Sequence, residues 1–64
     1  AFKWYRDAAE KGNAEAQYAA AWMLLKGFGA KKNIKLARYF LQKSASQKHE
    51  KSIELLKLLT EDNQ

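Results

Sequence analysis

Residues 1–13 read AFKWYRDAAEKGN, and residues 37–49 read ARYFLQKSASQKH. A shift of 36 residues relates the two stretches and pairs positions of similar size or polarity: Ala1 with Ala37, Trp4 with Phe40, Tyr5 with Leu41, Ala8 with Ser44, Ala9 with Ala45, and Asn13 with His49. The same shift places Ala16, Ala20 and Met23 on Ser52, Leu56 and Leu59. A period of roughly 20 to 50 residues predicts stacked helix pairs, because each pair is too small to bury its own apolar face.

The helices and turns can be placed from the breaks in the pattern. Apolar residues recur at helical spacing over residues 1–11, 14–26, 34–47 and 50–60, and no segment alternates with the period of a strand. Gly12 suits a helix stop, and Asn13 and Asn33 suit N-caps. Gly27 and Gly29 end the second helix. The turn before residue 50 has no glycine, and residues 61–64 are polar and expected to fray. The sequence predicts an all-α chain of about four helices.

Length and composition bound the fold. The chain has 64 residues, no cysteine and one histidine, so neither disulfides nor a Cys/His zinc site can compensate for a small core. It begins inside a helical pattern without a methionine, and we interpret it as an excerpt from a longer protein. The longest run without a charge covers residues 16–25, well short of the roughly 20 apolar residues of a transmembrane helix.

The small and large apolar residues have a packing role first. Alanines allow two helix axes to approach closely, and we expect this of Ala8, Ala9, Ala16, Ala20 and Ala37. We expect Trp4, Phe40 and Met23 to fill the gaps between helix pairs. Inward-facing residues on the third helix are expected to include Ile34, Ala37, Phe40, Leu41, Ser44 and Ala45. Replacement of a buried Trp4 by alanine would cost roughly 3 to 5 kcal/mol.

A motif in the chain reads Trp4-Tyr5, Ala8-Ala9-Glu10, Gly12, Ala14 and Ala16-Gln17-Tyr18, and it continues with Gly27, Gly29, Asn33 and Ala37. This motif resembles the Sel-one-like repeat (SLR) family, a relative of the tetratricopeptide repeat. The resemblance covers residues 1 to about 47, and it implies an α-α superhelix of stacked antiparallel helix pairs. It departs from the family pattern where Ala-Ala-x-x-Gly would recur, since the chain has Ser44-Ala45-Ser46-Gln47-Lys48. The last helix has lost the Ala-x-Ala-Gln signature, as expected of a capping element.

The resemblance implies a domain organisation within residues 1–64. Residues 1–12 would be the second helix of a preceding repeat, 13–48 one full repeat, and 49–64 a capping helix and its frayed tail. The whole would be the C-terminal part of an SLR solenoid. SLR proteins serve as adaptors in multiprotein assemblies, including bacterial host-interaction and envelope complexes, so the expected partner is a protein or peptide.

The candidate partner-binding residues follow from the concave wall, which the first helix of each repeat lines in the family. Carried over by position, Tyr18, Ala19, Trp22 and Lys26 would face this groove, with Glu54, Leu55 and Leu58 at the corresponding positions of the last helix. Tyr18, Trp22 and Leu25 also form one stripe at helical spacing. The predicted site is therefore Tyr18, Trp22, Leu25, Lys26, Leu55 and Leu58. The alternative for Trp22 is packing against Leu58 or against further repeats. Leu55 and Leu58 extend beyond the packing stripe, so self-association through the last helix is plausible.

A second hypothesis rests on charge. The net charge is +5, and no acid lies between Glu15 and Glu50. An anionic partner, nucleic acid or membrane lipid, could bind the third helix and the loop before it through Lys31, Lys32, Lys35, Arg38 and Lys43. A solvated outer helix face explains the same charges, and one exposed ring at Tyr39 gives little support for base stacking.

No pattern in the sequence predicts an enzyme, a cofactor or a metal. Residues 27–32 superficially resemble a phosphate loop but lack the preceding strand and the Gly-Lys-Ser/Thr run, so we expect a turn. His49 has Glu50 as its one neighbouring acidic partner and no cysteine, so we expect a turn-exposed or capping role rather than a metal ligand. Ser44, Ser46 and Ser52 have no base that would activate a nucleophile.

Overall fold

The computed structural model describes residues 1–62, with the side chains of residues 1–60. This part consists of α1 (Phe2–Glu10), α2 (Ala14–Lys26), α3 (Ile34–Ser46) and α4 (Glu50–Asp62), without any strand. The all-α prediction is confirmed. α4 runs two residues beyond its predicted end because no glycine or proline follows Thr60 to stop it. The rest of the predicted frayed tail, Asn63 and Gln64, lies outside the described residues.

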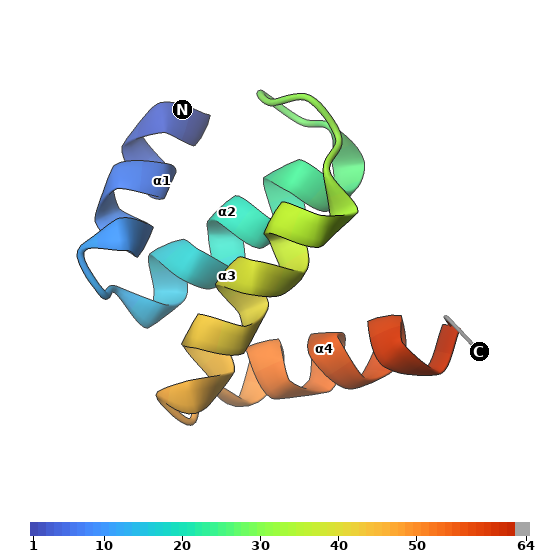
Figure 1. Ribbon diagram of the computed structural model, residues 1–64. Helices are drawn as coiled ribbons and strands as arrows, with labels where there is room; N and C mark the ends of the chain where they lie inside the picture. The colour runs from blue at the N-terminus through green and yellow to red at the C-terminus, as the bar shows by residue number, and fades with distance from the viewer. Residues whose placement is uncertain (63–64) are drawn as a thin grey trace.

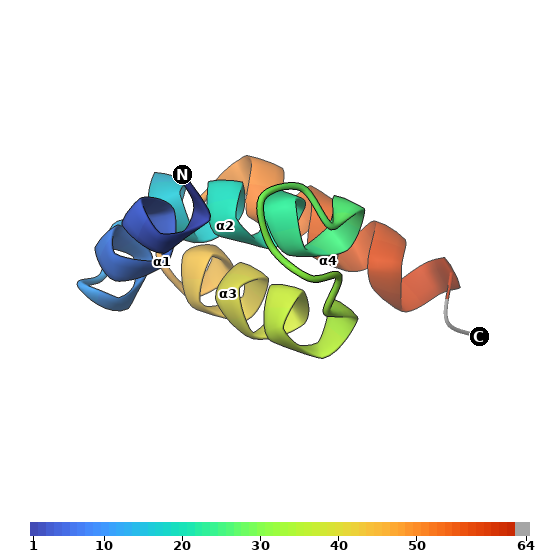
Figure 2. The ribbon, with the colours of Figure 1, turned by 90° about the horizontal axis from the view of Figure 1, so that it is seen from above.

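The helices follow one another through space in their sequence order. α1 packs on α2, α2 on α3 and α3 on α4 (Figure 1). Seen from above, α3 lies on one side of the molecule, with α2 and α4 on the other (Figure 2). The Cα atoms span 32 × 25 × 14 Å. A thickness of 14 Å along the shortest axis fits an open stack of two helix layers and not a closed bundle.

The turns confirm most of the predicted caps. Gly27 ends α2 at φ 67°, ψ 34°, a left-handed conformation that glycine adopts without strain. Asn13 and Asn33 begin α2 and α3, and their side-chain oxygens accept hydrogen bonds from the backbone N–H groups of Ala16 and Leu36, each at 3.0 Å. These amides would otherwise have no partner in the first helical turn.

The turn between α3 and α4 repeats this geometry with different residues. Lys48, shifted 36 residues from Gly12, has φ 65°, the one positive φ of a non-glycine residue in the described part of the chain. His49, shifted from Asn13, accepts a hydrogen bond at Nδ1 from the backbone N–H of Ser52 at 3.3 Å. The expected capping role of His49 is confirmed. The same Nδ1 atom lies 2.9 Å from Ser52 Oγ.

The core is built mostly from small residues. Ala20, Ala21 and Ala37 are fully buried, as are the larger Phe40 and Leu41. Leu24 is 2% exposed and closes the core at the end of α2. Short side chains at these positions let α2 lie close to both of its neighbours. Of the five alanines predicted to pack between helices, Ala9, Ala16, Ala20 and Ala37 are buried, and Ala8 is partly buried against the same cluster.

Buried hydrogen bonds tie the stack together at one end. The Gln17 side chain, 2% exposed, donates from Nε2 to the Ala9 carbonyl oxygen at 2.9 Å. Ser44 Oγ donates to the Ala14 carbonyl oxygen at 2.9 Å, and Ser52 Oγ donates to Ser44 Oγ at 2.7 Å. These bonds join α1 to α2, α3 to α2, and α4 to α3, so buried polar groups are satisfied at each joint.

Two predictions about the core are wrong. Trp4 is 68% exposed, although Phe40, 36 residues later, is 1% exposed. The reason is that α3 packs between α2 and α4, whereas α1 packs on α2 alone. Ile34, the first residue of α3, is also exposed.

Candidate functional site

The candidate site begins with two aromatic side chains of α2. Tyr18 and Trp22 are half-buried, and their rings meet edge to face with centroids 6.3 Å apart. The Lys26 ammonium lies 5.1 Å from the centroid of the Trp22 ring, a cation–π contact. These residues recur every four positions, so they form one row along the helix.

This row continues across to α4. The Tyr18 ring lies 5.2 Å from the imidazole of His49, centroid to centroid, and His49 immediately precedes α4. We call Tyr18, Trp22 and Lys26 the α2 row. The contact fixes one end of the row against the start of α4, while Lys26 at the other end is exposed.

α4 carries the other predicted site residues. The 36-residue shift relates Leu58 to Trp22, a member of the α2 row. It relates Leu55 to Ala19, which follows Tyr18 of that row. Leu58 is 57% exposed, whereas Leu55 packs partly against the core. α2 and α4 also lie on the same side of the molecule (Figure 2). The two helices thus present apolar side chains at equivalent positions.

The six predicted residues differ in how far they belong to the core. Tyr18, Leu25 and Leu55 are among the partly buried side chains packed against the buried cluster. Trp22 is half-buried and is not among those side chains in the described part of the chain. Its described ring contacts are with Tyr18 and Lys26, both on its own helix. Lys26 and Leu58 are therefore the exposed members of the six, and Trp22 is a half-buried member outside the buried cluster.

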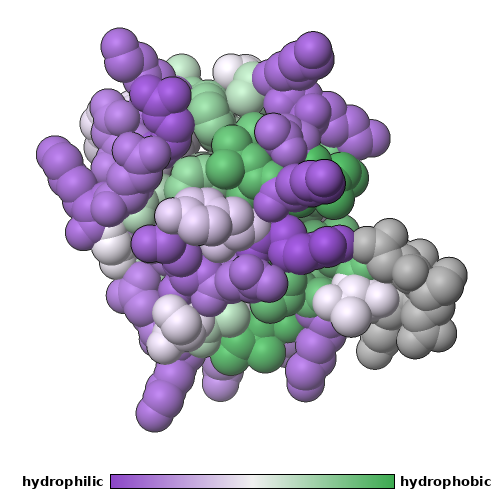
Figure 3. Space-filling model, in the orientation of Figure 1, coloured by the Kyte–Doolittle hydropathy of each residue, from purple (hydrophilic) through white to green (hydrophobic). Residues whose placement is uncertain are grey.

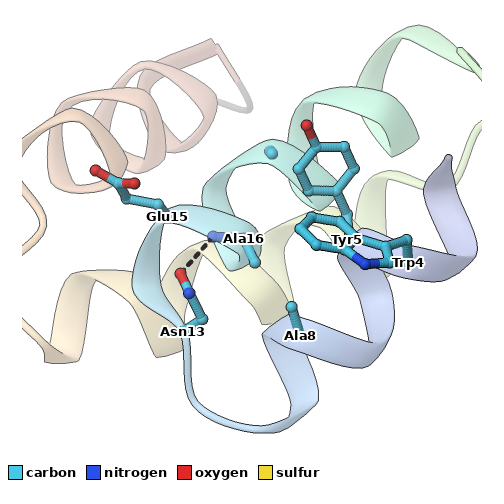
Figure 4. Close-up of a pocket in the computed structure, with 7 residues that line it drawn as sticks. Trp4, Tyr5, Ala8, Asn13, Glu15 and Ala16 are labelled. Atoms are coloured by element: carbon cyan, nitrogen blue, oxygen red, sulfur yellow. Dashed lines mark hydrogen bonds between the residues drawn. The ribbon is translucent and has the colours of Figure 1, made fainter.

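The structure also contains a hollow that the sequence did not predict. It measures about 360 Å³ and lies between α1 and α2, and none of the six predicted residues lines it (Figure 4). Its lining residues are Trp4, Tyr5, Ala8, Asn13, Glu15, Ala16 and Ala19. The Trp4 and Tyr5 rings meet edge to face at 5.1 Å, and the Glu15 carboxylate points away from them (Figure 4). The uncovered face of α1 creates this hollow, so only the packing of the helices reveals it.

The cations of the second hypothesis fall into two groups. On α3, Arg38 is half-buried, and the Lys43 ammonium lies 5.4 Å from the centroid of the Tyr39 ring. Lys31, Lys32 and Lys35 are exposed on the preceding loop and the start of α3. The one ion pair among the described residues joins Arg6 to Asp7 at 3.6 Å. Lys31, Lys32 and Lys35 therefore have no ion-pair partner within the described part of the chain.

The described residues contain no group of three His, Asp or Glu side chains that could hold a metal ion. None of the helices in the described part combines the length and the apolar character needed to cross a membrane.

Helices that pack in sequence order, with caps and core positions repeated at a 36-residue shift, define the chain as an α-helical repeat domain. The Sel1 repeat family model matches residues 1–13 and 14–49, and the chain belongs to this family. Sel1 repeats generally mediate protein–protein interaction and are not catalytic. Neither a comparison with curated proteins nor one with solved structures gave a match.

Proposed function

We propose that this chain is part of a protein-binding scaffold, and that a peptide or partner domain binds along the α2 row and the equivalent face of α4. The observation that carries the proposal is the position of Trp22. α2 buries Ala16, Gln17, Ala20, Ala21 and Leu24 against its neighbours, yet it leaves a large aromatic ring outside the buried cluster. Rigid aromatic side chains are favoured anchors in interfaces because they offer large area at small entropic cost.

The charges around Trp22 suggest the partner's chemistry. Lys26 stacks on the ring, and its ammonium remains exposed at the end of the row. A partner with an apolar side chain for Trp22 and an acidic group for Lys26 would satisfy both. Leu58, at the equivalent position of α4, would extend the apolar contact.

The experiment selects short peptides that bind the chain from a displayed random library and measures their dissociation constants by isothermal titration calorimetry. Trp22→Ala should weaken binding by about 30-fold or more, equivalent to about 2 kcal/mol, with helicity intact. Trp4→Ala is the matched control, because it removes an exposed tryptophan from a different helix. Equal binding to wild type and Trp22→Ala would contradict the proposal. Loss of helical signal in Trp22→Ala would assign the ring to the core instead.

We also propose the unit boundaries 1–12, 13–48 and 49–64, with α4 as a capping helix. Support comes from the two equivalent turns, at Gly12-Asn13 and Lys48-His49. Further support comes from α4, where Lys57 and Thr60 stand at the positions that Ala21 and Leu24 hold on α2, and both are exposed. A polar surface at these positions disfavours packing of another helix in the manner of α3.

A second copy of the chain is another candidate partner for the exposed Leu58. We propose this self-association through α4 as an alternative to a separate partner at that residue. Sedimentation equilibrium over a wide concentration range distinguishes the two, since a monomer at every concentration would rule out the second copy.

A further inference from the structure

The loop between α2 and α3 holds the most exposed large hydrophobic side chain of the described residues. Phe28 is 73% exposed, more than Trp4, Leu58, Tyr39 or Ile34. It lies between Gly27 and Gly29, which have φ values of 67° and 75°. The loop is the thin green segment at the top of Figure 1, at one end of the molecule.

Backbone hydrogen bonds close this loop at both ends. The N–H of Phe28 donates to the Met23 carbonyl oxygen at 2.8 Å, and the N–H of Asn33 donates to the Leu24 carbonyl oxygen at 3.0 Å. Gly27 lies close to Lys32, since a Cβ atom built on it would come within 3.5 Å of the Lys32 Cβ. Phe28 is thus held outward by a closed turn and does not hang from an open segment.

The residues around Phe28 carry charge of one sign. Lys26, Lys31, Lys32 and Lys35 are exposed, and none has an ion-pair partner among the described residues. We call these four residues the loop cations. No acidic residue lies between Glu15 and Glu50 to offset them. Figure 3 shows hydrophobic and hydrophilic residues side by side at the upper edge of the molecule, the region in which Figure 1 places the loop.

We propose that the loop of residues 27–33, with the loop cations, is a docking site for the surface of an anionic lipid bilayer. Lysine ammonium groups would lie among the negatively charged headgroups, and the Phe28 ring would enter the apolar region beneath them. A phenyl ring has no polar atom to desolvate, so its insertion into that region is favourable. This surface shares Lys26 with the α2 row, but Phe28 and the other three loop cations lie outside that row, and the proposal does not depend on the proposed protein-binding function.

The same residues fit a nucleic acid less well. Proteins that bind single strands place successive bases on several aromatic side chains. Here the loop offers one ring, and the next exposed ring, Tyr39, lies on α3 with the Lys43 ammonium stacked on it. The four loop cations are all lysines, hydrated point charges without the planar fork by which arginine binds phosphates and nucleic acids in bidentate fashion.

The test measures partition of the chain onto phosphatidylcholine vesicles with and without phosphatidylserine, by vesicle sedimentation. We expect binding only with phosphatidylserine present, and a steep loss as salt is raised from about 0.05 to 0.5 M. Phe28→Ala should lower the partition coefficient about tenfold, whereas Tyr39→Ala, an exposed aromatic outside the loop, should leave it unchanged.

Charge reversal separates this site from the general basic character of the chain. Lys31→Glu with Lys32→Glu should lower the partition coefficient more than about 25-fold, at about fivefold for each lysine neutralised. Lys51→Glu with Lys57→Glu is the matched control, because both lysines are exposed on α4 and the change in net charge is the same. All these side chains are exposed, and far-ultraviolet circular dichroism verifies that each variant is folded.

Three results would overturn the proposal. They are no binding to phosphatidylserine vesicles, equal losses in the two charge-reversed proteins, and a Phe28→Ala variant that binds as well as wild type. A parallel titration with single-stranded poly-U RNA covers the competing ligand. RNA binding that depends on the loop cations, without vesicle binding, would assign the patch to nucleic acid.

Discussion

Trp4 and Phe40 occupy equivalent positions in the repeat, and we predict very different consequences when each is replaced by alanine. Phe40 is 1% exposed, on the helix that packs on both α2 and α4, and loss of a fully buried phenylalanine costs about 3 to 5 kcal/mol. A chain of this length has a free energy of unfolding of about 3 to 10 kcal/mol, at about 0.05 to 0.15 kcal/mol per residue. Phe40→Ala should therefore remove most of the stability.

Trp4→Ala should cost far less. The side chain is 68% exposed, so about a third of its surface, about 80 Å², is buried. At about 25 cal/mol per Å² this gives an upper bound of about 2 kcal/mol, and the better helix propensity of alanine offsets about 0.5 kcal/mol. The two substitutions should differ by about 1.5 kcal/mol or more, in the order opposite to the sizes of the two side chains.

Urea unfolding followed by circular dichroism at 222 nm measures this difference, provided that the slope with denaturant is unchanged between variants. If Phe40→Ala is unfolded without urea, Phe40→Leu and Trp4→Leu form a milder pair with the same expected order. Equal losses of stability at both positions would refute the reasoning, since it would mean that α1 is covered as fully as α3.

Two further predictions concern the turn before α4. Lys48→Gly should raise the free energy of unfolding by about 0.5 to 1 kcal/mol in thermal or urea unfolding, because glycine adopts the observed φ of 65° without steric cost; an unchanged or lower stability would count against strain at this residue. His49→Asn should be nearly neutral, because asparagine already caps α2 at the equivalent position, whereas His49→Ala should cost about 1 kcal/mol in the same assay; equal effects of the two would show that the Nδ1 bond to Ser52 contributes nothing.

The turns and the small-residue core could be predicted from the sequence because both depend on local chemistry. Gly27 is needed for a left-handed cap, and Asn13 and Asn33 supply the oxygen that a helix start lacks. Alanines repeated at helical spacing indicate close helix packing whatever the partner is. The turn at Lys48 was harder to place, because lysine adopts there the conformation that the pattern assigns to glycine.

Exposure could not be predicted in the same way, because it depends on what lies on both sides of a helix. Trp4 and Phe40 share a register position, and only the number of packed neighbours separates them. The hollow beside Trp4 has the same origin and no signature in the sequence. Phe28 appeared as a residue inside a glycine turn, and only the closed backbone shows that its ring is held outward. The six predicted partner-binding residues remain a prediction.

The contacts between adjacent repeats are apolar in one case and polar in the other, at equivalent positions of the repeat. Ala8 and Ala16 occupy the positions in the first joint that Ser44 and Ser52 occupy in the second. Both serines are fully buried, and their hydroxyls form a chain from Ser52 to Ser44 to the Ala14 carbonyl oxygen. A buried hydroxyl without a partner would be costly, but a pair that satisfies itself is nearly as well tolerated as two methyl groups. The serines also make the helix packing more specific, because each hydrogen bond forms only when α3 and α4 have one position along α2. The polar joint therefore fixes where α4 lies beside the α2 row, which an alanine joint would leave to shape alone.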